Sequence, residues 1–326
     1  MTTPGLPLRV GDLGPTVRDL HRRLVAVGGV DLGDPGVFDS DTSEAVRQFQ
    51  KRRGIIVDGI CGPQTWAALI EASHQLGDRM LYLRSPMSRG DDVMQLQQQL
   101  GSLGFDAGWV DGIFGPATES ALRDFQRNQG LTPDGVLGID TVRSLRNLRG
   151  RAAGSKTVAE VREAEALRGL PGLVSGRRLV IGESGGIPSI VDSLARRLKV
   201  DGAQVLALHH PDLSVQAKSA NEWVGDVFIG MTLANEDHSV AYFATEGFES
   251  AGGHALASRC ARRLGPILAC ELPSSGLRLP ILRETRMPAI WCRLGPPPLV
   301  VESAASIVST IRVALTEWCA DPLLQG

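Results

Sequence analysis

The residues best suited to metal chemistry lie in the C-terminal half of the chain. Glu183 occupies a glycine-rich loop, and three histidines follow it: His209, His210 and His238. Carboxylate and imidazole groups are common zinc ligands, so these four residues could rebuild a metal site. A His-His-Pro-Asp turn is nevertheless more often a solvated loop than a ligand pair, and Arg293 would repel a dication at close range. We therefore predict that the chain holds no metal.

The same loop offers a candidate nucleophile. Gly182, Ser184 and Gly186 match the G-x-S-x-G elbow that presents a serine between a strand and a helix. The acidic and imidazole partners would be Asp226 or Asp237, and His238 or His254. That class of hydrolase needs several strands before the elbow, whereas only helical patterns precede it here. We therefore interpret the loop as a glycine turn, where backbone N–H groups could bind an anion beside Arg293.

Alternating strand and helix patterns must position these residues. Apolar runs predict strands at 178–182, 203–208, 226–233, 239–245 and 288–294. Amphipathic segments predict helices at 187–198, 214–223, 252–264 and 301–318. The last strand, Pro288–Leu294, is stopped by a glycine and three prolines, which is typical of a buried strand in a mixed or parallel sheet. The alternation indicates an α/β sheet covered by helices.

The N-terminal half is an internal repeat. Residues 14–72 and 90–148 align without a gap at an offset of 76 and share eighteen identical positions. Each copy predicts three short helices, with the second ending at Gly54 or Gly130 and the third beginning near Thr65 or Thr141. The repeat therefore predicts two all-α modules built alike.

The repeated motifs resemble the peptidoglycan-binding domain 1 family. The first copy reads A-V-x-x-F-Q followed by D-G-I-C-G-P-Q-T-W, and the second carries A-L-R-D-F-Q and D-G-I-F-G-P-A-T. The resemblance implies a three-helix module that binds cell-wall peptide, glycan or a protein. We assign the large apolar residues, Trp66 and Trp109 included, to the cores. The loops supply the candidate ligand contacts: Asp58, Gly59, Thr65, Asp134, Gly135 and Thr141.

The C-terminal patterns resemble the zinc-dependent N-acetylmuramoyl-L-alanine amidases of type 3. In that family a histidine after the first strand, a glutamate and a second histidine hold zinc, and a glutamate at a strand end moves a proton. Here the first loop has Ser184 and no histidine, Thr232 aligns with the second histidine, and Arg293 aligns with the catalytic glutamate. No carboxylate matches the ligand glutamate. The resemblance therefore implies the amidase fold without its zinc or its catalytic residues, leaving Arg293 as a candidate ligand-binding residue.

These patterns define the expected domains. We expect module 1 at 1–78, module 2 at 79–150, a linker with one exposed helix at 151–177, and the amidase-like domain at 178–322. The linker assignment rests on its charged, alanine-rich sequence and on the glycine and proline that follow the helical pattern. The chain is thus predicted to be multidomain, with two all-α modules followed by an α/β domain.

Composition adds limits on location and partners. The 326 residues include 43% hydrophobic and 21% charged residues, and a net charge of −2 favours neither nucleic acid nor an anionic membrane. No apolar run is long enough to span a bilayer, and the start lacks the basic and apolar segments of a signal peptide. Five cysteines without a Cys-x-x-Cys pair favour buried reduced thiols. We therefore expect a cytoplasmic protein.

The whole chain resembles the CwlM-type proteins of actinobacteria. That resemblance implies a non-catalytic regulator or scaffold of peptidoglycan precursor synthesis. It would act by contact with a cytoplasmic enzyme such as the enolpyruvyl transferase and could bind a peptidoglycan fragment or precursor. Two alternatives stay open: a zinc-dependent N-acetylmuramoyl-L-alanine amidase, and a protein that only attaches to peptidoglycan. Metal content separates the regulator from the amidase, and localisation separates it from wall attachment.

Overall fold

The structure is a computed structural model that describes residues 5–28, 32–33, 36–148, 157–235, 238–245 and 247–323. It divides into two compact units, Met1–Ala159 and Glu160–Gly326, and each is described by itself. Within the described residues, no helix combines the length and apolar character needed to cross a bilayer.

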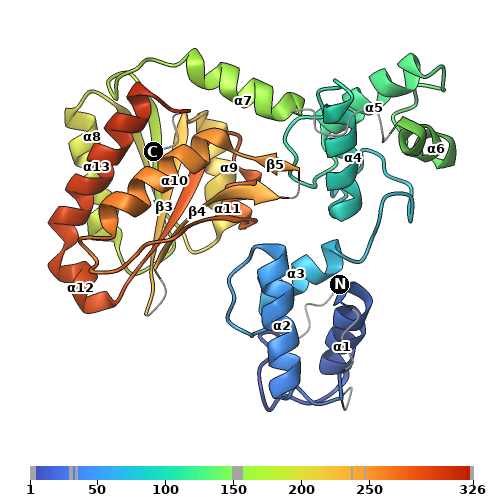
Figure 1. Cartoon of the computed structure of the whole chain (residues 1–326), viewed down its shortest axis with the longest axis horizontal. Coiled ribbons are helices and arrows are strands. Elements are labelled where there is room, and N and C mark those ends of the chain that lie inside the picture. Colours follow the sequence, from blue (N-terminus) through green and yellow to red (C-terminus); the bar gives the residue numbers. More distant parts are fainter. Residues whose placement is uncertain are drawn as a thin grey trace. The chain divides into compact units, whose positions relative to one another are not determined.

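The first unit holds the two predicted three-helix modules (Figure 1). Module 1 contains α1 (Pro15–Gly28), α2 (Ser40–Arg53) and α3 (Pro63–Glu71), and module 2 contains α4 (Asp91–Ser102), α5 (Pro116–Asn128) and α6 (Ile139–Leu148). As predicted, α2 ends at Gly54, whose φ of 59° places it in the left-handed region. The helix order is the same in both copies, which confirms the repeat.

Each module has its own apolar core. Phe38, Phe49 and Leu69 are buried in module 1, and their equivalents at the offset of 76 are buried in module 2. The interpretation of Trp66 as a core residue is confirmed. Trp109 is only half-buried and lies outside the core cluster of module 2, so that part of the prediction was wrong.

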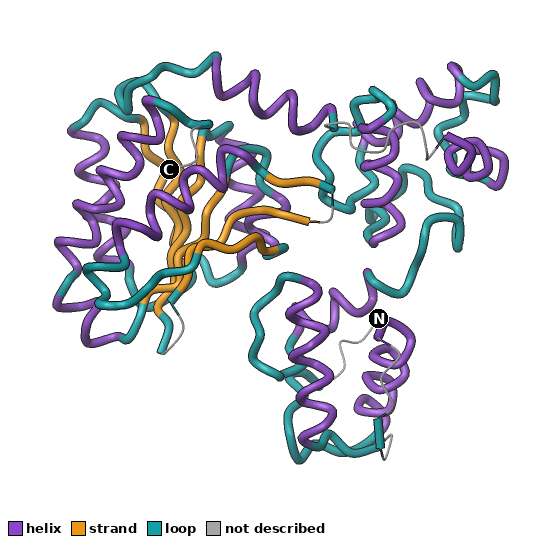
Figure 2. Tube along the Cα trace, in the orientation of Figure 1, coloured by secondary structure: helices purple, strands orange, loops and turns teal. Residues whose placement is uncertain are grey.

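The second unit is built on one seven-stranded mixed sheet (Figure 2). Its strands are β1 (Arg178–Glu183), β2 (Gln204–His209), β3 (Val227–Leu233), β4 (Ser239–Thr245), β5 (Phe248–Glu249), β6 (Ser274–Leu277) and β7 (Ala289–Leu294). Strands β2, β1, β3 and β7 are adjacent and parallel, β4 runs antiparallel to β7, and both β5 and β6 pair with β4. The predicted strands are all present, whereas β5 and β6 were missed.

Helices cover both faces of this sheet. On one face α8 (Pro188–Val200), α10 (Ala251–Leu264) and α13 (Ala304–Ala320) share an apolar core with Ile229, Ile290 and other alternate strand residues. Figure 1 shows α9 (Leu213–Trp223) and α11 (Pro280–Glu284) on the opposite face. The short helices α11 and α12 (Pro297–Glu302) were not predicted. The observed layers match the expected α/β architecture.

The helix predicted in the linker is present, but the prediction that it is exposed was wrong. This helix, α7 (Val158–Arg168), buries Glu163 and Leu167, one turn apart, within the second unit. The Glu163 carboxylate accepts hydrogen bonds from the Ser250 hydroxyl at 2.5 Å and the Ala251 backbone N–H at 3.0 Å, at the start of α10. Burial raises the pKa of Glu163 from its ordinary value of 4.5 to about 7. The helix is therefore part of the α/β unit, because its inner face packs there.

The five cysteines, all of them in the described part of the chain, are free thiols. Four are buried, and burial raises the pKa of the Cys61 and Cys260 thiols to about 12. Both groups are therefore protonated at neutral pH and are poor nucleophiles.

Candidate functional site

Three positions singled out from the sequence meet at the carboxyl ends of the parallel strands. The Ser184 hydroxyl donates a 3.1 Å hydrogen bond to the Thr232 hydroxyl, and the Ser184 backbone N–H donates to the Met231 carbonyl at 3.3 Å. Thr232 pairs in register with Arg293 on β7. Ser184, Thr232 and Arg293 thus follow one another across the sheet, and we call them the polar row.

Topology explains why these residues converge. From β1 the chain reaches β2 on one side, and from β2 it crosses back to β3 on the other side of β1. After β3 the chain continues to β4, which lies beyond β7, so the loops after β1 and β3 diverge. In open α/β sheets, ligands bind at such a switch point. Ser184 and Thr232 lie at this switch point. The structure thus supports a site at this edge of the sheet.

The polar row does not fit a zinc ion. Zinc prefers imidazole, thiolate and carboxylate ligands, whereas Ser184 and Thr232 offer hydroxyl groups that bond each other and Arg293 offers a cation. In the part of the chain that the structure describes, no group of three or more His, Cys, Asp or Glu residues could hold a metal ion. The predicted loss of zinc remains a prediction for measurement.

The alternative ligands come together only in part, and on the other face of the sheet. Glu183 precedes Ser184, so its side chain points to the α8 face by the alternation of a strand. There, one Glu183 carboxylate oxygen lies 3.2 Å from His209 Nδ1, and His209 Nε2 lies 3.1 Å from an Asp192 carboxylate oxygen. Both nitrogens of His209 therefore face carboxylates, and the ring presents none to a metal.

The other two histidines do not join Glu183. His210 Nδ1 accepts a 3.0 Å hydrogen bond from the Asp212 backbone N–H, which makes it part of its own turn. His238 Nδ1 is buried and has no hydrogen-bond partner among the described residues. The four residues proposed as a rebuilt metal site are thus divided among separate contacts.

Among the described residues, Asp226 and His254 lie in contacts that do not involve the serine elbow. Asp226 precedes β3 at the opposite end of the sheet, where its carboxylate accepts the Arg178 backbone N–H at 2.7 Å. His254 stacks on Tyr242 with ring centroids 4.5 Å apart and pairs with Glu249. Asp237 lies outside the described residues. The Ser184 hydroxyl donates to Thr232 instead, so the glycine-turn interpretation fits the geometry better.

A buried glutamine that the sequence analysis missed organises this edge. Gln216 on α9 donates to the Glu183 carbonyl at 2.8 Å and the His210 carbonyl at 2.6 Å, which ties together the ends of β1 and β2. A Cβ at Gly182 would lie 2.1 Å from the Gln216 side-chain oxygen, so this position requires glycine. Packing against Gln216 therefore explains the first glycine of the G-x-S-x-G match, without any role in catalysis.

The module loops proposed to contact ligand are held by buried glutamines. Gln50 donates to the Asp58 carboxylate at 2.7 Å and to the Thr65 hydroxyl at 3.0 Å, and its oxygen accepts the Gly59 N–H at 2.9 Å. In module 2, Gln126 makes the same bonds to Asp134, Thr141 and Gly135 at 2.8, 3.2 and 2.9 Å. The sequence motif contained both glutamines, but the sequence analysis gave them no role.

These contacts correct the proposed ligand set. Thr65 and Thr141 are 4% and 5% exposed and bond internally, and the backbones of Gly59 and Gly135 are buried, so none of the four is placed to contact a ligand. Asp58 and Asp134 are exposed, yet each uses an oxygen to fix its own loop. The backbone hydrogen bond from Val136 lowers the pKa of Asp134. These residues shape the loops.

The same arrangement occurs a third time inside module 2. Gln97 on α4 bonds to Asp111, Thr118 and the Gly112 N–H at 2.8, 3.1 and 2.8 Å. The D-G-I-F-G-P-A-T segment thus belongs to the loop before α5, not to the loop that aligns with D-G-I-C-G-P-Q-T. In module 1 the position of Gln97 is taken by His21, whose Nε2 lies 2.9 Å from the Thr42 hydroxyl. We call Gln50, Gln97 and Gln126 the loop glutamines.

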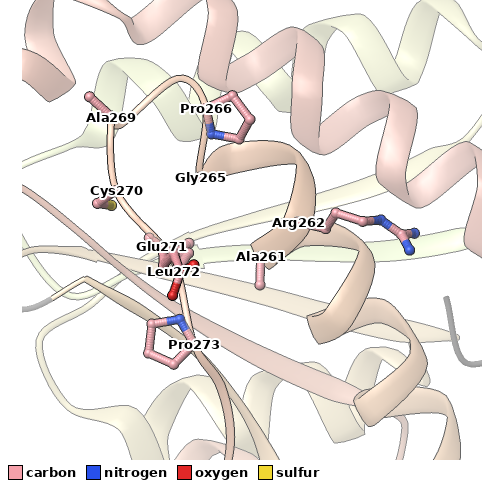
Figure 3. Close-up of a pocket in the computed structure, with 9 residues that line it drawn as sticks. All are labelled: Ala261, Arg262, Gly265, Pro266, Ala269, Cys270, Glu271, Leu272 and Pro273. Atoms are coloured by element: carbon pink, nitrogen blue, oxygen red, sulfur yellow. The ribbon is translucent and has the colours of Figure 1, made fainter.

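A large hollow in the second unit lies apart from the polar row. It has a volume of about 920 Å³ and is formed by the end of α10 and the loop that leads to β6 (Figure 3). Figure 3 shows Arg262 extending away from the loop that carries Cys270 and Glu271. None of its lining residues belongs to the polar row, and its charged lining residues are Arg262 and Glu271.

Comparisons with known proteins agree with both parts of this architecture. Residues 14–69 and 89–145 match the family described as "Putative peptidoglycan binding domain". A curated relative, N-acetylmuramoyl-L-alanine amidase CwlM of Mycobacterium tuberculosis, is 33% identical over 336 residues, covering 89% of this chain and 82% of its own length. N-acetylmuramoyl-L-alanine amidase CwlL of Bacillus licheniformis is 35% identical over 166 residues, which cover 44% of this chain and 46% of that protein.

The solved structures to which this chain is similar include an N-acetylmuramoyl-L-alanine amidase from Clostridium difficile 630. It is 16% identical and covers 45% of this chain and 99% of its own, with a TM-score of 0.38. The similarity to CwlM is extensive, because it spans most of both proteins. The chain therefore belongs to the CwlM family, in which two modules of the peptidoglycan-binding type precede an amidase-like domain.

Proposed function

We propose that this protein is a non-catalytic, amidase-like regulator or scaffold of peptidoglycan precursor synthesis. It acts in the cytoplasm through contact with a cell-wall synthesis enzyme, such as the enolpyruvyl transferase, and binds peptidoglycan fragments or precursors through its modules. Membership of the CwlM family and the two peptidoglycan-binding modules support the cell-wall connection. The residue types of the polar row support the absence of catalysis.

The polar row carries this proposal. Hydrolysis of an amide needs a group that polarises the carbonyl and a base that takes a proton from water. Ser184 and Thr232 bond each other through neutral hydroxyl groups, and a guanidinium group such as that of Arg293 has donors but no acceptor, so it cannot serve as the base. These three side chains can bind and orient a polar group, but they do not provide the means to cleave an amide.

A combined activity and metal assay tests the absence of catalysis. Purified full-length protein is incubated with peptidoglycan, released stem peptides are detected by mass spectrometry, and zinc is measured by elemental analysis after dialysis. We expect no released peptide and no stoichiometric zinc. Peptide release that a chelator abolishes, with about one zinc per chain, would establish an active amidase instead.

Affinity capture tests the regulatory role. The tagged full-length protein is used to recover partners from a cytosolic extract of its own host, with direct binding to the purified enolpyruvyl transferase as the defined readout. We expect a direct complex that changes the rate of the captured enzyme. Recovery of the protein in the wall fraction, with no cytosolic complex, would favour simple attachment to peptidoglycan.

The zinc amidase remains the second candidate because the curated relatives carry that name. CwlM and CwlL are both named N-acetylmuramoyl-L-alanine amidases. In this chain such an activity would need ligands other than the polar row. The chelator arm of the activity assay distinguishes it from the proposed regulator.

A further inference from the structure

A groove in module 2 has the size and the side chains of a small-ligand site. It has a volume of about 500 Å³ and lies between the turn Gly77–Met80 and α6, where residues from Ile139 to Asn147 line it. Pockets that bind small ligands usually enclose about 300–1,000 Å³. Met80 and Ile139, which line it, are 67% and 80% exposed and give the groove apolar walls.

The floor of the groove depends on a glycine. Gly77 has a φ of 103°, which side chains rarely tolerate. A Cβ at this position would also lie 3.2 Å from both Arg146 Nη2 and Val142 Cγ1. Any larger residue here would meet these two side chains, so Gly77 lets the turn pass close to α6 and leaves the groove open.

Two arginines of α6 line the groove. Arg146 Nη2 donates to the Leu76 carbonyl at 3.2 Å, which orients its guanidinium at the floor. Arg143 Nη1 lies 3.4 Å from an Asp140 carboxylate oxygen, and both side chains are at least 70% exposed. An exposed ion pair of this kind contributes little to stability, so a ligand carboxylate can replace Asp140 as the partner of Arg143. Arg79, by contrast, is already bound to the buried Asp92.

The equivalent surface of module 1 has different chemistry. At the offset of 76, Ala67, Ile70 and Glu71 stand where module 2 has Arg143, Arg146 and Asn147. The two modules share their helix order and have Gln50 and Gln126 at the same place, yet of α3 and α6 only α6 brings two guanidinium groups to this face. The difference identifies module 2 as the candidate for binding an anionic ligand.

We propose that the module 2 groove binds a short peptide through a carboxylate, with Arg143 and Arg146 as the anion-binding pair. Guanidinium groups bind carboxylates with two parallel hydrogen bonds, and the walls formed by Met80 and Ile139 accept small apolar side chains. The peptide stem of a muropeptide carries both features. This inference rests on the peptidoglycan-directed function proposed above and names one site for it.

Binding of a defined muropeptide tests the site. Isothermal titration of the full-length protein uses a soluble disaccharide-tetrapeptide and the same compound with its carboxylates amidated. We expect the double variant Arg143→Ala/Arg146→Ala to bind the free-acid compound at least tenfold more weakly. We expect the natural protein to discriminate against the amidated compound by a similar factor. Arg127→Ala is the matched control, because Arg127 is an exposed arginine of α5 in the same module, and it should bind as the natural protein does.

A charge-reversal variant separates a loss of binding from a loss of folding. Arg143 is 70% exposed, so Arg143→Glu should leave the fold intact, which circular dichroism checks, and should weaken binding more than tenfold. Unchanged binding in both variants would overturn the groove while leaving the peptidoglycan-directed function standing. A natural protein that binds no muropeptide would overturn both the groove and the proposed binding of peptidoglycan fragments by the modules.

Discussion

The two parts of the chain hold buried backbone groups with different side chains. In the modules, the loop glutamines satisfy the backbone of each loop with neutral amides. In the α/β unit, Glu163 does the same for the start of α10 with a carboxylate. An amide does not ionise, whereas a buried carboxylate does, at the cost of desolvation. The hydrogen bonds made by Glu163 therefore depend on pH, whereas those made by the loop glutamines do not.

A second contrast separates buried from exposed positions. The two modules have Gln50 and Gln126 at the same place, but their exposed faces carry Ala67 and Ile70 in one and Arg143 and Arg146 in the other. A buried polar side chain is tied to several partners at once, so replacing it is costly. Exposed side chains can differ without loss of the fold, and binding chemistry can therefore differ between modules that share one architecture.

Replacing a loop glutamine should produce the largest effect. Gln126→Ala leaves the buried Gly135 N–H without its partner and removes the hydrogen bonds from Gln126 to the buried Thr141 hydroxyl and the Val136 carbonyl. Each buried polar group that loses its partner costs about 1–3 kcal/mol. We expect the free energy of unfolding of module 2 to fall by about 4 kcal/mol in urea titration. Gln129→Ala, an exposed glutamine at the end of the same helix, should change it by less than about 0.5 kcal/mol. Equal effects of Gln126→Ala and Gln129→Ala would show that the buried hydrogen bonds of Gln126 do not stabilise module 2.

The pH response of Glu163 should be the next largest. Its pKa is raised from 4.5 to about 7 by burial, with Glu160 and Glu249 adding to the rise. The folded α/β unit therefore holds a proton that the unfolded chain releases, so this contribution is complete below about pH 4.5 and is lost as the pH rises through 7. A pKa difference of this size corresponds to about 3 kcal/mol.

Urea unfolding of the natural protein and of Glu163→Gln at pH 5 and pH 8 measures this response. The variant keeps one of the two oxygens that accept from Ser250 and Ala251, and it cannot ionise, so it should lose much less stability between the two pH values. The same pH dependence in both proteins would show that other groups cause it.

Transfer of the groove chemistry sharpens the comparison of the modules. Ala67→Arg together with Ile70→Arg places two guanidinium groups on α3, where both native residues are exposed. We expect the free-acid muropeptide to gain a weak second site in full-length protein that already carries Arg143→Ala/Arg146→Ala, with roughly fivefold recovery of affinity, or about 1 kcal/mol. Gln48→Arg, which adds charge elsewhere on module 1, should give no recovery.

The smallest effect is expected from repairing the polar row at one position. Arg293→Glu introduces a carboxylate, but Ser184 and Thr232 would still stand at the two positions where the amidase resemblance implies histidines. Catalytic groups that act together give strongly non-additive effects, so one of them restores little. We expect no muropeptide hydrolysis by mass spectrometry, with or without added zinc. Measurable hydrolysis by this single variant would mean that the remaining residues already form a competent site.

Much of the fold could be predicted because its signals are local. The repeat at offset 76 and the alternation of strands and helices depend on apolar spacing within short segments, and the predicted strands and long helices are present. The two-residue β5, the four-residue β6 and the short α11 and α12 were missed, since they are too short to show a period. The burial of Glu163 was missed as well, because a charged helix predicts exposure unless its packing partner is known.

The sequence by itself determined which residue types stand at each position of the site. Ser184, Thr232 and Arg293 replace the zinc ligands and base that the amidase resemblance implies, and no folding changes that chemistry. Tertiary structure alone decided which of these residues meet. Ser184 and Thr232 are 48 residues apart yet share a hydrogen bond, while Glu183, adjacent to Ser184, turns to the opposite face toward His209. Apolar periodicity is a local property of the chain, whereas the partner of a polar side chain depends on how distant strands are ordered in the sheet.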